Sequence, residues 1–217
     1  MSEVFAGLDW ASRLHAVCVI DERAVVRLQW EATHDAAGLA ELMRRRPDVV
    51  INLAAIASPS AAECQPELTA AVNHRGAVAV AHAVLAHAPA CRLIHVGSAV
   101  AYGDSFRAGR PVTEDDPLAP HGAYGTSKAN ADADLAALAA DGLNVVRLRP
   151  FWHAGPGQQA AYVVSSFASQ VARIMKGIAP PHVAVGNLDV CRDFLDVRDV
   201  ARLYADLATM EPGPLSA

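Results

Sequence analysis

Apolar residues in the first thirty positions fall into short runs that are separated by polar turns. These runs predict three strands, at 4–8, 16–20 and 25–30, and such short connections favour antiparallel neighbours. Residues 34–46 then carry apolar side chains at helical spacing and end in three arginines before Pro47, which is typical of a helix C-terminus. The chain is therefore expected to begin with an antiparallel three-stranded meander and a helix.

The pattern changes after Pro47 to uninterrupted apolar runs that alternate with alanine-rich segments. Continuous apolar strands are typical of a parallel sheet that is buried on both faces. The expected strands are 48–55, 91–97, 144–149 and 194–197, and the expected helices are 66–87, 123–141, 160–176 and 199–209. This alternation predicts an α/β fold with a Rossmann-like, doubly wound, mostly parallel sheet. The antiparallel meander replaces the first half of such a sheet.

Composition narrows the classes of partner. The chain has 217 residues, 53% of them hydrophobic, with a net charge of −5, so it can bury a core and offers no basic footprint for nucleic acid. Its four cysteines have no short spacing, and its start lacks the cationic residues of a signal peptide, which together favour a cytoplasmic protein. The longest uncharged stretch, 150–172, contains glycine, proline and glutamine and is not expected to span a membrane.

The chemistry is concentrated around Tyr124 and Lys128. A spacing of four residues places the phenol and the ammonium group on one helical face. The pairing is unusual in this chain, because Lys128 and Lys176 are its only lysines. A nearby cation favours the phenolate, so it lowers the pKa of a tyrosine toward the range useful for proton transfer. Ser98, at the end of an expected strand, could then orient a substrate carbonyl or hydroxyl. The alternative is an ordinary solvated helix face.

Several segments together resemble the extended short-chain dehydrogenase/reductases, the NAD-dependent epimerase/dehydratase family. They are Asn52-Leu-Ala-Ala55, the run from Val96 to Gly103, Tyr124-Gly-Thr-Ser-Lys128, Arg149-Pro-Phe151 and the run from Arg192 to Val200. Within that family, the region that follows Arg149 is most similar to the GDP-4-keto-6-deoxy-mannose reductases and their dehydratase relatives. The resemblance covers about residues 47–212.

This resemblance implies a catalytic trio of Ser98, Tyr124 and Lys128 and a cofactor that is NAD or NADP. It further implies cofactor contacts from Leu53, Ala54, Ala55, Tyr124, Lys128 and Pro150, and substrate contacts from Ser98 and Arg192. The substrate implied is a nucleotide-sugar, and two copies are expected to pair through the helix of Tyr124 and the preceding one. Trp152 stands where the family usually has asparagine, so its indole is expected to reshape the sugar pocket.

The first 46 residues do not fit this family. A dinucleotide site needs a glycine-rich turn that leads into a helix, and no G-x-G-x-x-G occurs before Asn52. Residues 3–46 instead resemble the start of an insertion-sequence transposase with a RuvC-like, RNase-H-fold nuclease domain, in which Asp9 would be one of four metal ligands. A single carboxylate cannot hold a two-metal site, so no metal is expected. We therefore interpret 1–46 as an RNase-H-like fragment merged into the sheet, and 47–217 as the C-terminal part of a truncated reductase domain. Both kinds of fold place the fourth strand beside the first, so the two resemblances imply the strand order 3-2-1-4-5-6.

Three functions remain open from the sequence. The first is an NAD(P)-dependent oxidoreductase or epimerase acting on a nucleotide-sugar, most simply by reducing a 4-keto-6-deoxy sugar. The second is a catalytically silent remnant of that family, because the cofactor-binding glycine loop is missing. The third is a transposase fragment, against which the negative charge and the single acidic ligand count.

Overall fold

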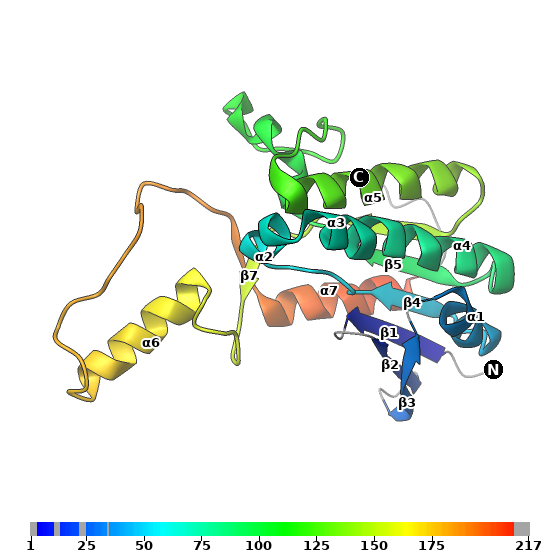
Figure 1. Cartoon of the computed structure of the whole chain (residues 1–217), viewed down its shortest axis with the longest axis horizontal. Coiled ribbons are helices and arrows are strands. Elements are labelled where there is room, and N and C mark those ends of the chain that lie inside the picture. The colour runs from blue at the N-terminus through cyan, green and yellow to red at the C-terminus, as the bar shows by residue number, and fades with distance from the viewer. Residues whose placement is uncertain (1–3, 11–13, 22–24, 34, 211–217) are drawn as a thin grey trace. The chain divides into compact units, whose positions relative to one another are not determined.

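The computed structural model describes residues 4–10, 14–21, 25–33 and 35–210, and for part of the first three strands it describes the backbone only. It divides into two compact units, one formed by the described residues up to Pro150 with the end of the last helix from Asp206, the other by Phe151–Ala205. The larger unit contains the main sheet (Figure 1). The predicted catalytic trio belongs to the same unit. Each unit is described separately below.

The main sheet has six strands in the order β3-β2-β1-β4-β5-β6. The strands are β1 (Val4–Trp10), β2 (Leu14–Asp21), β3 (Val26–Thr33), β4 (Val49–Asn52), β5 (Arg92–Val96) and β6 (Val145–Leu148). The first three are antiparallel, whereas β1, β4, β5 and β6 are parallel to one another. The predicted strand order and the predicted meander are therefore confirmed. The expected turn at 22–24 lies outside the described residues.

Helices cover both faces of this sheet, as a doubly wound fold requires. One face packs against α1 (Ala36–Arg44), α4 (Ala77–His87) and α5 (Gly122–Ala140), through a core that includes Leu42, Val84 and Leu135. On the other face, Val49 and Ile94 pack against Leu207 near the end of α7 (Val197–Thr209). The alternation of Val49 and Val50 between the two cores shows that β4 is buried on both sides.

A buried arginine anchors the end of α7 to the sheet. Arg92, at the start of β5, is 8% exposed, and its Nη1 donates to the carbonyl oxygens of Leu207 and Met210 at 2.7 and 2.6 Å. These carbonyls belong to the last helical turn, whose oxygens lack partners within the helix. The guanidinium therefore satisfies them and complements the negative end of the helix dipole.

The helix predicted at 66–87 is interrupted in its geometry. It consists of α3 (Pro66–Thr69), a π-helical segment η1 (Ala70–Gly76) and α4. A short helix α2 (Pro59–Cys64), which the sequence pattern did not predict, precedes it. Single π-helical turns are frequent at functional sites, and this one carries the buried Asn73.

The smaller unit has one long helix and a two-stranded sheet. Helix α6 (Val163–Met175) and the start of α7 accompany β7 (Trp152–Ala154) and β8 (Phe194–Asp196). These strands are parallel, with Trp152 opposite Phe194. The sequence predicted the strand near Phe194 but not β7 or this pairing. Among the described residues, no helix is long and apolar enough to cross a membrane.

Candidate active site

The carboxyl ends of β4, β5 and β6 bring several predicted site residues together. Because the three strands are parallel and paired in register, with Asn52 beside His95 and Val96 beside Leu148, the residues after each strand meet at one edge of the sheet. Leu53–Ala55 follow β4, Ser98 follows β5 and Pro150 follows β6. The backbone N–H of Ala99 donates to the Pro150 carbonyl at 3.0 Å, which extends the contact past the strand ends.

Ser98 begins a short 3-10 helix, η2 (Ala99–Tyr102). Its hydroxyl oxygen accepts a hydrogen bond from the Val100 N–H at 3.2 Å, as an N-cap does. The same hydroxyl keeps its proton for donation to another oxygen. A half-buried serine in this position can therefore be fixed by the helix and still contact a substrate.

The part of helix α5 that carries Tyr124 and Lys128 packs against η2 and the end of β5. A Cβ at Gly125 would lie 3.4 Å from the Val100 Cγ1 and backbone oxygen, so this turn of α5 lies directly against η2. The Lys128 Nζ donates to the carbonyl oxygen of Val96 at 2.9 Å. The trio that the family resemblance implies thus lies within one unit of the structure.

Lys128 is buried, and burial controls its charge. The residue is 3% exposed, and burial lowers the pKa of its ammonium group to about 8. At neutral pH it is still mostly protonated, so it supplies a positive charge on the face of α5 that carries Tyr124. This is the electrostatic condition under which a tyrosine can act as a proton donor and acceptor.

Two asparagines that the sequence analysis missed shape the segment after β4. Asn52 Oδ1 accepts from the Ala54 N–H at 3.2 Å. Asn73 Oδ1 accepts from the Ile56 N–H at 2.8 Å, while Asn73 Nδ2 donates to the Ile56 carbonyl at 3.1 Å and to Ser127 Oγ at 3.1 Å. Asn73 therefore joins the predicted cofactor segment to α5, between Tyr124 and Lys128. The motif Asn52-Leu-Ala-Ala55 contained the first asparagine, whereas Asn73 gave no sequence signal.

Asp132 is a buried acidic residue on α5. Its side chain is 4% exposed and forms ion pairs with Arg147 and Arg149. Burial alone would raise the pKa of Asp132, but the hydrogen bonds and charges of the two arginines outweigh it and the pKa is lowered. Asp134, two residues further along α5, is exposed and pairs with His74 at 2.6 Å.

The predicted substrate residue Arg192 belongs to the smaller unit, apart from the trio. It is exposed, and its guanidinium carbon lies 4.8 Å from the centre of the Trp152 ring. This is a cation–π contact. Trp152 therefore contacts the very residue that the family resemblance places beside the nucleotide-sugar.

The residues at the carboxyl ends of the strands fit the nicotinamide side of a dinucleotide but not its diphosphate. Leu53 is 44% exposed after β4, and Ala55 and Pro150 are half-buried, so apolar side chains remain accessible at the carboxyl ends of β4 and β6. In dinucleotide-binding sheets, the strand beside β4 leads into a glycine-rich turn and a helix whose N-terminus faces the diphosphate. Here β1 occupies that place but continues into β2, with Trp10 paired to His15. The described residues therefore leave no helix for the diphosphate, and the side chain of Asp9 lies outside them.

A model of the NAD dependent epimerase/dehydratase family matches residues 9–214. The chain belongs to this family. It is 34% identical over 170 residues to the GDP-6-deoxy-D-mannose reductase of Pseudomonas aeruginosa. This alignment covers 78% of the chain and 56% of the relative. It is also 34% identical over 157 residues to a dTDP-4-dehydrorhamnose reductase of Mycobacterium tuberculosis, covering 71% and 50%. The chain thus spans about half the length of the curated relatives that it matches.

Solved structures give the same assignment for this family member. RMD from Pseudomonas aeruginosa complexed with NADPH superposes with a TM-score of 0.74 at 33% identity, covering 81% of this chain and 60% of that one. UDP-glucose 4-epimerase from Thermus thermophilus in complex with NAD gives 0.67 at 26% identity, covering 83% and 59%. The predicted family and its Rossmann-like fold are confirmed. The RNase-H-like origin of residues 1–46 and the fusion near residue 46 stay predictions.

Proposed function

We propose that this chain performs the proton-transfer part of nucleotide-sugar reduction, with the 4-keto group of a nucleotide-linked 6-deoxy sugar as the group acted upon. The observation that carries the proposal is the packing of the first turns of α5, which carry Tyr124 and the buried Lys128, against the end of β5 and the short helix that Ser98 caps. The reductases to which the chain is similar support this choice of substrate class.

The roles of the three residues follow from their chemistry. Tyr124 donates its phenolic proton to the oxygen that becomes a hydroxyl. The Ser98 hydroxyl donates a hydrogen bond to the same oxygen and stabilises the negative charge that develops there. The Lys128 ammonium group stabilises the phenolate that Tyr124 leaves behind. When bound, NAD(P)H supplies the hydride that the family's reductions need.

The apolar surface of Leu53, Ala54, Ala55 and Pro150 is the part of the chain that would hold the nicotinamide side. Arg192, in the smaller unit, would bind the nucleotide-sugar through its positive charge. The choice between NAD and NADP depends on a residue that reads the ribose, and such a residue follows the glycine-rich turn that this sequence lacks.

A second candidate function is a silent member of the family, in which the trio remains but no cofactor is held. The continuation of β1 into β2 favours it, because no helix N-terminus then faces the diphosphate. This candidate predicts a folded protein that binds neither NADPH nor NADH at millimolar concentration.

Titration of nicotinamide fluorescence with the purified chain separates the two functions. A saturable change with NADPH or NADH, followed by oxidation of the cofactor when a GDP-linked 4-keto-6-deoxy sugar is added, supports the reductase. Tyr124→Phe should then abolish turnover while it leaves cofactor binding and thermal unfolding nearly unchanged. No fluorescence change and no turnover would leave the silent member, and equal turnover in the variant would remove Tyr124 from the chemistry.

A further inference from the structure

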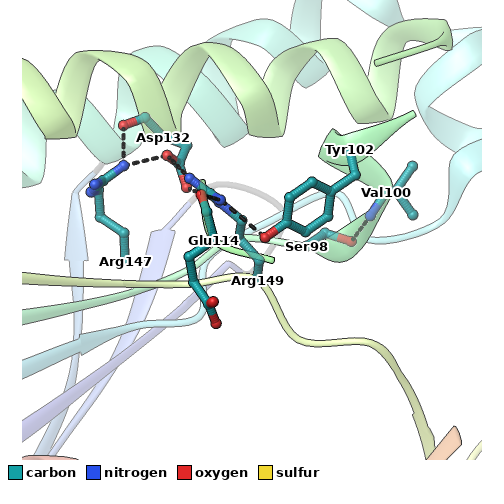
Figure 2. A network of polar contacts seen from close by, with 7 residues as sticks. All are labelled: Ser98, Val100, Tyr102, Glu114, Asp132, Arg147 and Arg149. Atoms are coloured by element: carbon teal, nitrogen blue, oxygen red, sulfur yellow. Dashed lines mark hydrogen bonds and ion pairs between the residues drawn. The ribbon is translucent and has the colours of Figure 1, made fainter. Parts of the chain in front are cut away.

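The guanidinium group of Arg149 joins three parts of the larger unit. Figure 2 shows that it lies between α5 and the segment that follows Ser98. Its Nε and Nη2 donate to the two carboxylate oxygens of Asp132, each at 3.0 Å. Its Nη1 donates to the Tyr102 hydroxyl at 3.0 Å and to the Glu114 carbonyl at 2.8 Å.

The bidentate pair with Asp132 fixes the orientation of this group. A planar guanidinium that shares two hydrogen bonds with one carboxylate cannot rotate without losing both. The Arg149 side chain is 15% exposed and the Asp132 side chain 4%, so water competes weakly for these bonds. The direction of Nη1 toward Tyr102 is therefore set by α5.

Arg149 and Pro150 hold the helix of Ser98 at both of its ends. At the first end, the Ala99 N–H donates to the Pro150 carbonyl at 3.0 Å. At the last residue, the Tyr102 hydroxyl accepts from Arg149, and the Tyr102 ring lies under the guanidinium, 5.2 Å from its carbon. Two consecutive residues after β6 thus position the whole of η2, whose N-cap is Ser98.

The other end of the connection lies on the helix of Tyr124 and Lys128. Asp132 follows Lys128 by one helical turn and Tyr124 by two, so it lies on the same side of α5 as both. Arg149 consequently couples the Ser98 helix to the helix of the two other trio residues through a single rigid group.

We propose that Arg149 is a positioning residue that fixes Ser98 relative to Tyr124 and Lys128. The inference rests on the proposed function, because it assigns Arg149 a part in aligning that trio. Its physical basis is that proton transfer and hydrogen bonding to one substrate oxygen tolerate little displacement, and about 1 Å of misplacement can lower a rate by about a hundredfold.

Arg147 provides a matched control. It also donates to Asp132 Oδ1 and lies in β6, two residues before Arg149. None of its contacts among the described residues reaches the Ser98 helix or Glu114. The variants Arg149→Lys and Tyr102→Phe therefore break the connection, whereas Arg147→Lys weakens only the pairing of Asp132. Tyr102→Phe removes one hydroxyl and keeps the ion pair, so it tests the inference even if Arg149→Lys folds poorly.

Hydrogen exchange of the full chain tests the connection without cofactor or substrate. Amides of residues 99–120 should exchange about tenfold faster in Arg149→Lys and Tyr102→Phe than in the wild type, because the segment opens locally. Amides of β4 and α4 should not change, and Arg147→Lys should leave 99–120 within about twofold of the wild type. Unchanged exchange in both Arg149→Lys and Tyr102→Phe, or an equal increase in Arg147→Lys, would overturn the proposal.

Turnover of the nucleotide-linked 4-keto sugar tests the alignment itself. We expect kcat to fall about tenfold or more in Arg149→Lys and severalfold in Tyr102→Phe, with KM within about twofold, because alignment affects the transition state more than binding. An unchanged kcat in Arg149→Lys, or the same loss in Arg147→Lys, contradicts the positioning role. A wild-type chain without turnover refutes the proposed function and, with it, the catalytic meaning of the connection, whereas hydrogen exchange still decides whether Arg149 holds the Ser98 segment.

Discussion

The Nζ of Lys128 donates a hydrogen bond to the carbonyl oxygen of Val96 at 2.9 Å, at a position where the lysine is 3% exposed. This contact joins α5 to the end of β5, two residues before Ser98. It also places a cation where solvation is poor, and burial accordingly lowers the pKa of Lys128 to about 8. A cation in such a place opposes stability, because burial disfavours its charged form.

Replacing Lys128 by methionine should therefore stabilise the protein while it removes activity. A pKa that is lower in the folded than in the unfolded state means that the unfolded state binds more protons, so wild-type stability increases as pH increases from 8 to 10.5. At pH 7 the free energy of unfolding of Lys128→Met should exceed that of the wild type by about 2 kcal/mol, minus the contribution of the lost hydrogen bond to Val96. This difference should decrease as pH increases from 8 to 10.5. Urea unfolding at several pH values measures it.

Lys176 is the control for that experiment, because it is exposed. Lys176→Met should change the free energy of unfolding by less than about 0.5 kcal/mol at every pH. If Lys128→Met is less stable than the wild type at pH 7, or if its effect does not depend on pH, burial does not dominate the energetics of Lys128.

Asp132→Asn should destabilise the larger unit strongly. The substitution leaves Arg147 and Arg149 without their buried countercharge, and breaking a buried pair by removing one partner costs about 3–5 kcal/mol. Asp134→Asn, two residues away on the exposed face, removes only an ion pair with His74 and should cost less than about 1 kcal/mol. Denaturant unfolding of the two variants should rank them in this order, and equal losses would contradict the buried network.

The stability of the protein should decrease in acid because of His95. The ring is 2% exposed, and burial, with a smaller effect of the nearby Lys128 charge, lowers its pKa to about 3. Between pH 6.5 and about pH 3, His95 is protonated in the unfolded state but stays neutral in the folded state. Folding should therefore lose about 1.4 kcal/mol per pH unit as pH decreases through this window.

Unfolding curves of His95→Phe and of the wild type at pH 7, 6 and 5 test this expectation. The free energy of unfolding of the variant should lack the part of the pH dependence that comes from His95, whatever the variant's absolute stability. The same replacement at the exposed His182 should leave the slope as it is. Identical slopes in His95→Phe and the wild type would show that His95 is not the titrating group.

Gly103→Ala should disrupt the segment that connects η2 to α5. Gly103 has a φ of +52°, and a Cβ there would overlap the carbonyl oxygen of Ala119, to which this segment is bridged. Gly142→Ala is the matched control, since its φ is +103° but nothing lies within 4 Å of the added carbon. We expect a loss of more than about 2 kcal/mol at Gly103 and about 1 kcal/mol at Gly142, measured by thermal unfolding. A smaller loss at Gly103 would show that the segment can shift away.

Features that depend on neighbours in the chain were predictable. The spacing of Tyr124 and Lys128 fixes their common helix face, because an α-helix turns once in 3.6 residues whatever its surroundings. The short connections of the first three strands likewise predicted their antiparallel pairing, since hairpins allow few alternatives. The strand order followed instead from the resemblance to two folds in which the fourth strand lies beside the first.

What the tertiary structure decided are the contacts between polar groups that lie far apart in sequence. Asp132 resembles a solvent-exposed helix residue until β6 brings Arg149 to it, and Asn73 gives no signal until Ile56 and Ser127 reach its side chain. Local periodicity reports which face of an element is apolar, but a buried polar side chain breaks that rule. Only packing in three dimensions supplies the hydrogen-bond and ion-pair partners that offset the free-energy cost of burying it.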